Sequence, residues 1–155
     1  LFGRRANDHN GIYRLLKQAI DSKSIVYDGN LESMREYIHV TDAARLSVQI
    51  LEDAYANRHI ILTGHERMMV KNLLRMIAEM LPGKVEIKVS DRQVYGHYAM
   101  TPYAFHPKVG HKLVATDYVD LGQGLLDCLA ELHERLHNDQ HPEGDWLVSD
   151  EAKKG

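Results

Sequence analysis

The sequence lacks the features of a disulfide-rich, membrane-spanning or strongly charged protein. Its 155 residues include one cysteine, Cys128, so an intramolecular disulfide is impossible and a reducing, cytoplasmic compartment is expected. No apolar run approaches the roughly 20 residues that a membrane-spanning helix needs. The net charge is only −3, so we expect neither nucleic acid nor an anionic membrane as a partner.

The sequence also lacks a glycine-rich dinucleotide-binding loop, because no Gly-x-x-Gly-x-x-Gly pattern occurs. This absence bears on Tyr13 and Lys17, which lie four positions apart in a predicted helix. At that spacing a lysine can lower the pKa of a tyrosine that acts as an acid–base catalyst. Without the loop, we interpret the pair as a coincidence of helix composition and predict no catalytic residue in this chain.

The pattern of apolar residues predicts an α/β or small α+β-like domain in which short strands alternate with helices. The strands are few, so the sheet should be small. One domain is expected over residues 1–137, followed by a polar tail over 138–155. Helices are predicted at 11–22, 42–55, 70–81 and 123–137, strands at 24–27, 35–40, 59–62 and 85–89, and a short helix or turn at 107–113.

A possible zinc-binding motif lies near the end of the last predicted helix. His133 and His137 are separated by one helical turn and Glu134 follows the first, the pattern of a small zinc-dependent hydrolase. Histidines at a helix C-terminus also interact favourably with the helix dipole, and we favour this alternative, with no metal bound. A third zinc ligand would have to come from His141, Glu143 or Glu151.

Two arginines next to predicted strands are candidates for binding phosphate. The guanidinium of Arg35 or Arg92 offers paired N–H donors that match phosphate oxygens. The alternative for each is a surface ion pair with a neighbouring carboxylate, and spacing alone favours the ion pair. The neighbouring acidic residues are Glu32 and Glu36 for Arg35, and Asp91 for Arg92.

The stretch 35–45, Arg-Glu-Tyr-Ile-His-Val-Thr-Asp-Ala-Ala-Arg, resembles the extended short-chain dehydrogenase/reductase family of NAD-dependent nucleotide-sugar epimerases and dehydratases. Their pattern is close to Arg-Asp-(Tyr or Phe)-(Ile or Val)-(His or Tyr)-Val-x-Asp-x-Ala, so Glu36 departs from it. One departure is Met69, which stands where the family has a helix-capping serine or threonine. The resemblance covers about residues 1–137, with further similar segments at 1–5, 11–14, 27–29, 60–74 and 123–135.

The resemblance implies that the chain is the C-terminal, substrate-binding part of a Rossmann-type epimerase. The chain opens at Leu1 without a methionine, so we expect a piece of a longer protein. The missing N-terminal Rossmann domain would carry the dinucleotide loop and the catalytic tyrosine. NAD(P) would be the cofactor of the intact parent, an isomerase or oxidoreductase, with none bound by this fragment, which should be inactive alone.

The resemblance also implies which residues bind a nucleotide-diphosphate sugar. Arg35 and Arg92 would contact the diphosphate, Ile25 and Tyr27 would lie against the base, and Arg14 stands at the family's helix-start arginine. Tyr27 can equally well pack against the core. A further alternative is a non-catalytic interaction module that forms a homodimer through an apolar face.

Overall fold

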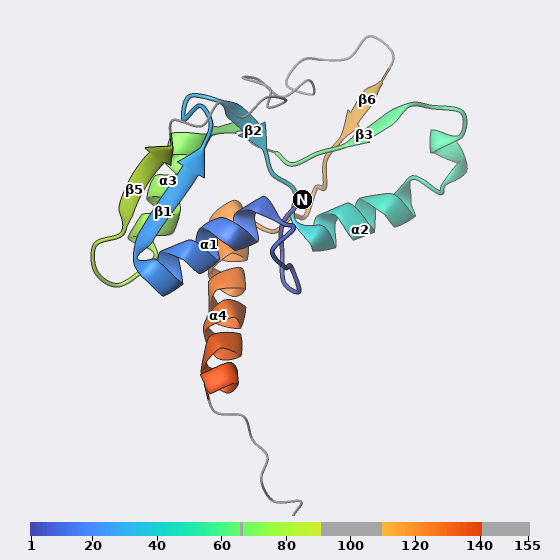
Figure 1. Ribbon diagram of the computed structural model, residues 1–155. Helices are drawn as coiled ribbons and strands as arrows, with labels where there is room; N and C mark the ends of the chain where they lie inside the picture. Colours follow the sequence, from blue (N-terminus) through green and yellow to red (C-terminus); the bar gives the residue numbers. More distant parts are fainter. Residues whose placement is uncertain (66, 91–109, 141–155) are drawn as a thin grey trace, which may run out of the picture.

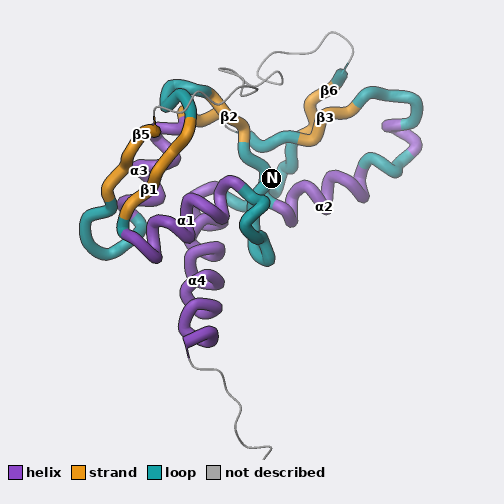
Figure 2. Tube along the Cα trace, viewed as in Figure 1, coloured by secondary structure: helices purple, strands orange, loops and turns teal. Residues whose placement is uncertain are grey.

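The computed structural model describes residues 1–65, 67–90 and 110–140, with side chains through residue 136. In these segments helices and short strands alternate (Figures 1 and 2), which confirms the predicted α/β class. In chain order the elements are α1 (Gly11–Ser22), β1 (Ser24–Asp28), β2 (Met34–Glu36), α2 (Val40–Gln49), a 3₁₀ turn (Asp53–Tyr55), β3 (Ile60–Leu62), β4 (Arg67–Met69), α3 (Val70–Glu79), β5 (Glu86–Ser90), β6 (His111–Leu113) and α4 (Leu121–Gln140).

The described strands form three separate pairs. β1 and β5 are parallel, with Ile25 opposite Ile87. β3 and β6 are also parallel, with Ile61 opposite Lys112. β2 and β4 are antiparallel, with Arg35 opposite Met68. Each parallel pair joins segments far apart in the sequence, so the fold depends on long-range pairing rather than on hairpins.

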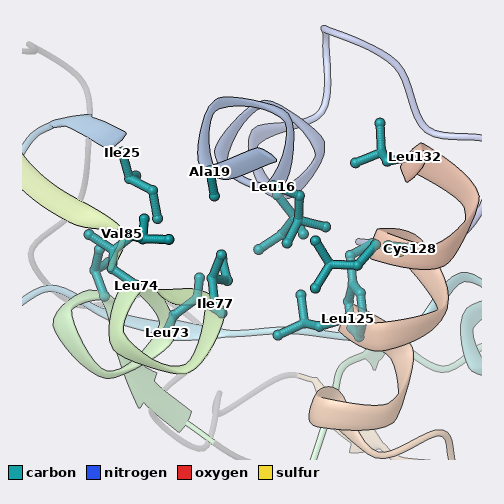
Figure 3. Close-up of a cluster of buried hydrophobic side chains, with 14 residues drawn as sticks. Leu16, Ala19, Ile25, Leu73, Leu74, Ile77, Val85, Leu125, Cys128 and Leu132 are labelled. Atoms are coloured by element: carbon teal, nitrogen blue, oxygen red, sulfur yellow. The ribbon is translucent and has the colours of Figure 1, made fainter. Parts of the chain in front are cut away.

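The main core lies where α1, α3 and α4 meet the β1–β5 pair, and Figure 3 shows their apolar side chains converging. Helical spacing explains the contribution of α1, since Ile12, Leu16 and Ala19 fall on one face and are buried. Among the side chains that solvent does not reach are Leu16, Ile25, Leu74, Ile77 and Leu125.

The junction of β4 and α3 shows how a helix begins without a capping side chain. Met69 holds the N-cap position and accepts no hydrogen bond from the first turn. Instead, the N–H groups of Val70 and Lys71 donate to the carbonyls of Ser33 and Leu31, both at 3.0 Å. The loop before β2 therefore satisfies backbone donors that a serine or threonine would otherwise satisfy.

Several predicted boundaries are wrong. The second helix ends at Gln49 rather than Tyr55, and a 3₁₀ turn follows. The segment predicted as a helix or turn at 107–113 contains strand β6, and β4 was not predicted at all. Strands β4 and β6 are each three residues long and depend on pairing with distant strands, which local periodicity does not reveal. None of the described helices is long and apolar enough to span a membrane.

Because Leu16 is buried and Leu51 is exposed, we expect their substitutions to have different effects on the free energy of unfolding. Leu16→Ala should lower the free energy of unfolding by about 2–5 kcal/mol, because it leaves a cavity among three helices. Leu51→Ala, at a position 80% exposed, should change it by less than about 0.5 kcal/mol. Urea denaturation followed by circular dichroism measures both, and equal losses would contradict this description of the core.

Candidate functional site

A groove of about 470 Å³ lies between the N-terminal half of α1 and strands β1 and β2. Its size is suited to a small organic ligand. Guanidinium, carboxylate, amide and phenol groups line it together with apolar side chains. The lining residues are Leu1, Asn10, Gly11, Ile12, Arg14, Leu15, Gln18, Val26, Tyr27, Asp28, Arg35, Glu36 and Tyr37.

The structure brings three of the five predicted ligand-binding residues to this groove. Arg14 comes from α1, Tyr27 from β1 and Arg35 from β2, so three separate elements contribute. Arg92 lies outside the described residues. The remaining residue, Ile25, does not line the groove.

Ile25 is a correction to the predicted site. Its side chain has no solvent exposure and belongs to the main core. The side chain of the adjacent Val26 points to the opposite face, is exposed and lines the groove. Tyr27 is half-buried, packs against the core and also lines the groove. Alternation along the strand would have pointed to Val26 only if the buried face of the strand had been known.

Arg35 does not form the surface ion pair that spacing alone favoured. Among the described residues, its guanidinium donates from Nη1 to the carbonyl of Met34, at 2.9 Å. Each neighbouring glutamate is held by a lysine: Glu32 by Lys71 and Glu36 by Lys112, both at 2.8 Å. The half-buried guanidinium therefore retains donors that no described carboxylate occupies.

Arg14 lies near the start of α1, where the helix dipole also favours an anion. Asn10 caps this helix by accepting a hydrogen bond from the N–H of Tyr13, at 3.1 Å. The first turn carries no acidic side chain. Nη1 of Arg14 donates to the carbonyl of Asp8, at 3.0 Å, which directs the side chain while using one of its five N–H donors.

Tyr37 supplies a phenol that stays protonated at neutral pH. The pKa of Tyr37 is raised to about 12, mainly by burial and partly by the nearby Tyr27, while the positive charge of Arg35 lowers it. Tyr37 also lines a second, smaller pocket. The phenol is therefore a hydrogen-bond donor at neutral pH.

Strand β2 is fixed in place by a mostly buried carboxylate. The two oxygens of Glu36 accept hydrogen bonds from Nζ of Lys112 on β6, at 2.8 and 3.1 Å, and Thr63 at the end of β3 also donates to it. The next residue, Gly64, passes so close that a Cβ there would lie 1.8 Å from the carbonyl oxygen of Tyr37. Glycine is required at this close approach.

A second pocket of about 40 Å³ lies beside the start of α2, a volume suited to a water molecule or two. Thr41 and Asp42 are residue types that commonly cap helices, but neither caps α2. His39 caps the helix, its Nδ1 accepting from the N–H of Thr41 at 3.3 Å. Asp42 is buried and accepts from the N–H of Val119, at 3.0 Å. Nε2 of His39 and Oδ1 of Asp42 have no hydrogen-bond partner in the described part of the chain.

The other two motifs gain no support as catalytic sites. The ammonium group of Lys17 is bound to Asp8 at 3.4 Å, and this hydrogen bond raises the pKa of Lys17. His133 is exposed on α4. Residues 1–65, 67–90 and 110–136 contain no group of three histidine, cysteine, aspartate or glutamate side chains that could hold a metal ion. The proposed third zinc ligands lie outside the described residues.

The family model of the NAD dependent epimerase/dehydratase family matches residues 1–64. No curated protein matches the sequence. Solved structures with the same fold include UDP-glucuronic acid 4-epimerase from Bacillus cereus in complex with NAD, at 16% identity over 86% of this chain and 42% of that one, with a TM-score of 0.65. MoeE5 in complex with UDP-glucose and NAD matches at 14% identity over 87% and 45%, with a TM-score of 0.64. A GDP-L-fucose synthetase from Naegleria fowleri matches at 16% over 88% and 44%, with a TM-score of 0.63.

These comparisons confirm the resemblance over residues 1–64 and correct its extent. The prediction that residues 1–137 form the C-terminal, substrate-binding part of an extended short-chain dehydrogenase/reductase is wrong, because the family match does not extend beyond residue 64. The structural matches show the shared α/β fold, and the chain spans less than half the length of these proteins. The motif at 35–45 carries the family resemblance but does not define a domain.

The different burial of the two lysine–glutamate pairs predicts that losing one lysine lowers the free energy of unfolding more than losing the other. Lys112→Met should lower the free energy of unfolding by about 3 kcal/mol, because it leaves the Glu36 carboxylate, whose side chain is 8% exposed, without its counter-charge. Lys71→Met should cost less than about 1 kcal/mol, because Glu32 is 60% exposed and water solvates it. Urea denaturation measures both, and equal costs would show that Glu36 is not a structural anchor.

Proposed function

We propose that the groove binds the diphosphate of a nucleotide sugar, and that the chain is a fragment of an NAD-dependent epimerase or dehydratase. The observation that carries this proposal is the convergence of Arg14 and Arg35 on one groove at the N-terminus of α1. A diphosphate carries negative charge on planar sets of acceptors, which guanidinium forks and a helix N-terminus both favour.

The other groove residues suit the remaining parts of such a ligand. Tyr27 offers a ring on which a base can stack, and its neighbour Val26 extends the apolar surface. The protonated phenol of Tyr37 can donate a hydrogen bond to a phosphate or sugar oxygen. Glu36 does not repel the diphosphate strongly, because Lys112 neutralises its carboxylate.

The comparisons support the ligand class rather than a particular ligand. The family is described as NAD dependent epimerases and dehydratases. One protein of the same fold is a UDP-glucuronic acid 4-epimerase, and another was solved with UDP-glucose. The substrate-binding role assigned to Arg14, Arg35, Tyr27 and the undescribed Arg92 therefore stands as a proposal for this chain.

The chemistry of the reaction is assigned to residues outside this chain. The sequence contains no glycine-rich dinucleotide loop, and Lys17 of its one Tyr-x-x-x-Lys pattern is bound to Asp8. NAD(P), when bound to the intact protein, would accept and return hydride. The contribution of this chain is to hold the diphosphate and thereby orient the sugar, so we propose that the chain alone has no turnover.

The proposal predicts that Arg35→Ala weakens UDP binding by about 10- to 100-fold, because charged hydrogen bonds to phosphate are worth about 1.5–3 kcal/mol. Isothermal titration calorimetry at fixed ionic strength measures the Kd. Arg75→Ala is the matched control, since Arg75 is exposed on α3 away from the groove and should leave the Kd unchanged. Equal Kd values for the two variants, or no UDP binding by the unsubstituted 155-residue chain, would refute the proposal.

A further inference from the structure

Two buried polar atoms beside the start of α2 have no hydrogen-bond partner among the described residues: Nε2 of His39 and Oδ1 of Asp42. The two residues are 8% and 4% exposed, and both line the pocket of about 40 Å³. Arg45 does not satisfy Asp42, because its Nη1 lies 3.8 Å from Oδ1, beyond hydrogen-bond distance. Buried polar atoms are nearly always bonded to protein or to ordered water, since an unpaired one costs free energy.

The hydrogen bond at the cap of α2 determines which nitrogen of His39 carries the proton. Nδ1 accepts from the N–H of Thr41, at 3.3 Å, so Nδ1 carries none. The neutral ring then has its proton on Nε2, which is a donor. The carboxylate of Asp42 only accepts, and its Oδ2 is already bonded to the N–H of Val119, at 3.0 Å. One donor and one acceptor therefore remain unpaired in the same pocket.

Contacts with the N-terminal segment hold His39 in place. The N–H of Phe2 donates to the carbonyl of Ile38 at 3.1 Å, and its carbonyl accepts from the N–H of Val40 at 2.7 Å. The ring of Phe2 also meets the imidazole edge-on, with the ring centroids 5.2 Å apart. Figure 1 shows the N-terminus of the chain beside the start of α2. The imidazole is therefore positioned without help from any molecule in the pocket.

Several other polar groups that line the pocket already have partners. Thr63 donates to the carboxylate of Glu36. A ring nitrogen of His65 is hydrogen-bonded to the carbonyl of Ala115, at 2.5 Å. Asp120 accepts from two backbone N–H groups at the start of α4, at 2.8 and 3.2 Å. These groups do not compensate the unpaired atoms of His39 and Asp42.

We propose that the pocket binds a water molecule, which accepts a hydrogen bond from Nε2 of His39 and donates one to Oδ1 of Asp42. A volume of about 40 Å³ admits water and excludes a sugar or a nucleotide. A cation does not fit, because a nitrogen that carries a proton cannot ligate a metal ion or accept from an ammonium group. Through the bond between Asp42 and Val119, the water links the first turn of α2 to the segment between β6 and α4.

The first test uses the unsubstituted 155-residue chain. Two-bond ¹H–¹⁵N correlations should show the proton of His39 on Nε2. A high-resolution crystal structure should show a water oxygen within about 3.2 Å of both Nε2 of His39 and Oδ1 of Asp42. The Nε2 proton should also give a cross-peak to a long-lived bound water. These measurements need no substitution, so they decide the matter whether or not a variant folds.

The second test fills the pocket. Ala115 is buried and lines it, so Ala115→Val should displace the water, abolish the cross-peak and lower the melting temperature by about 5 °C, because two buried polar atoms lose their partner. Filling a dry cavity would instead raise the melting temperature. Ala56→Val is the matched control, since Ala56 is exposed and does not line the pocket, and it should change neither readout.

Four results would overturn this inference: a proton on Nδ1 of His39, a direct hydrogen bond between Nε2 and Oδ1 without water, a cation at the site, or a higher melting temperature for Ala115→Val. The inference is independent of the proposed function, because neither Arg14 nor Arg35 lines this pocket. UDP binding without the bound water removes only the water site, and the bound water without UDP binding removes only the proposed ligand.

Discussion

The ion pair between Glu36 and Lys112 joins strand β2, which borders the groove, to the β3–β6 strand pair. Glu36 lies on β2 beside the groove, Lys112 lies on β6, and Thr63 at the end of β3 donates to the same carboxylate. A carboxylate with so little exposure requires these partners, since its desolvation is otherwise uncompensated. The ion pair thereby fixes the β3–β6 strand pair against the strand that carries Arg35, and Gly64 permits the close approach.

This arrangement explains why the groove can attract an anion although the whole chain is slightly acidic. The two glutamates nearest Arg35 in sequence are each neutralised by a lysine from another element. Arg35 and Arg14 both line the groove, next to a helix whose first turn carries no acidic side chain. Local charge placement, rather than net charge, determines what this surface binds.

The sequence predicts most of the core and part of the site. The spacing of Ile12, Leu16 and Ala19 is sufficient to find the buried face of α1. The partnership of Lys112 with Glu36 joins residues 76 positions apart, so no local pattern contains it. The same limit explains the unpredicted strand β4 and the misassigned β6, which depend on distant partners. Ile25 was misplaced because alternation along a strand does not say which face is buried until the packing is known.

A titration of the isotope-labelled chain with UDP, followed through backbone amide chemical shifts, tests the central claim most directly. The account predicts saturable shifts at Arg14, Tyr27, Arg35 and Tyr37, which line one groove although they come from separate elements. The amide signals of Val48 and Leu51, which are exposed and do not line the groove, should not shift. Shifts confined to the small pocket beside His39 and Asp42, or no saturable shift anywhere, would contradict the assignment of this groove as a nucleotide-diphosphate site.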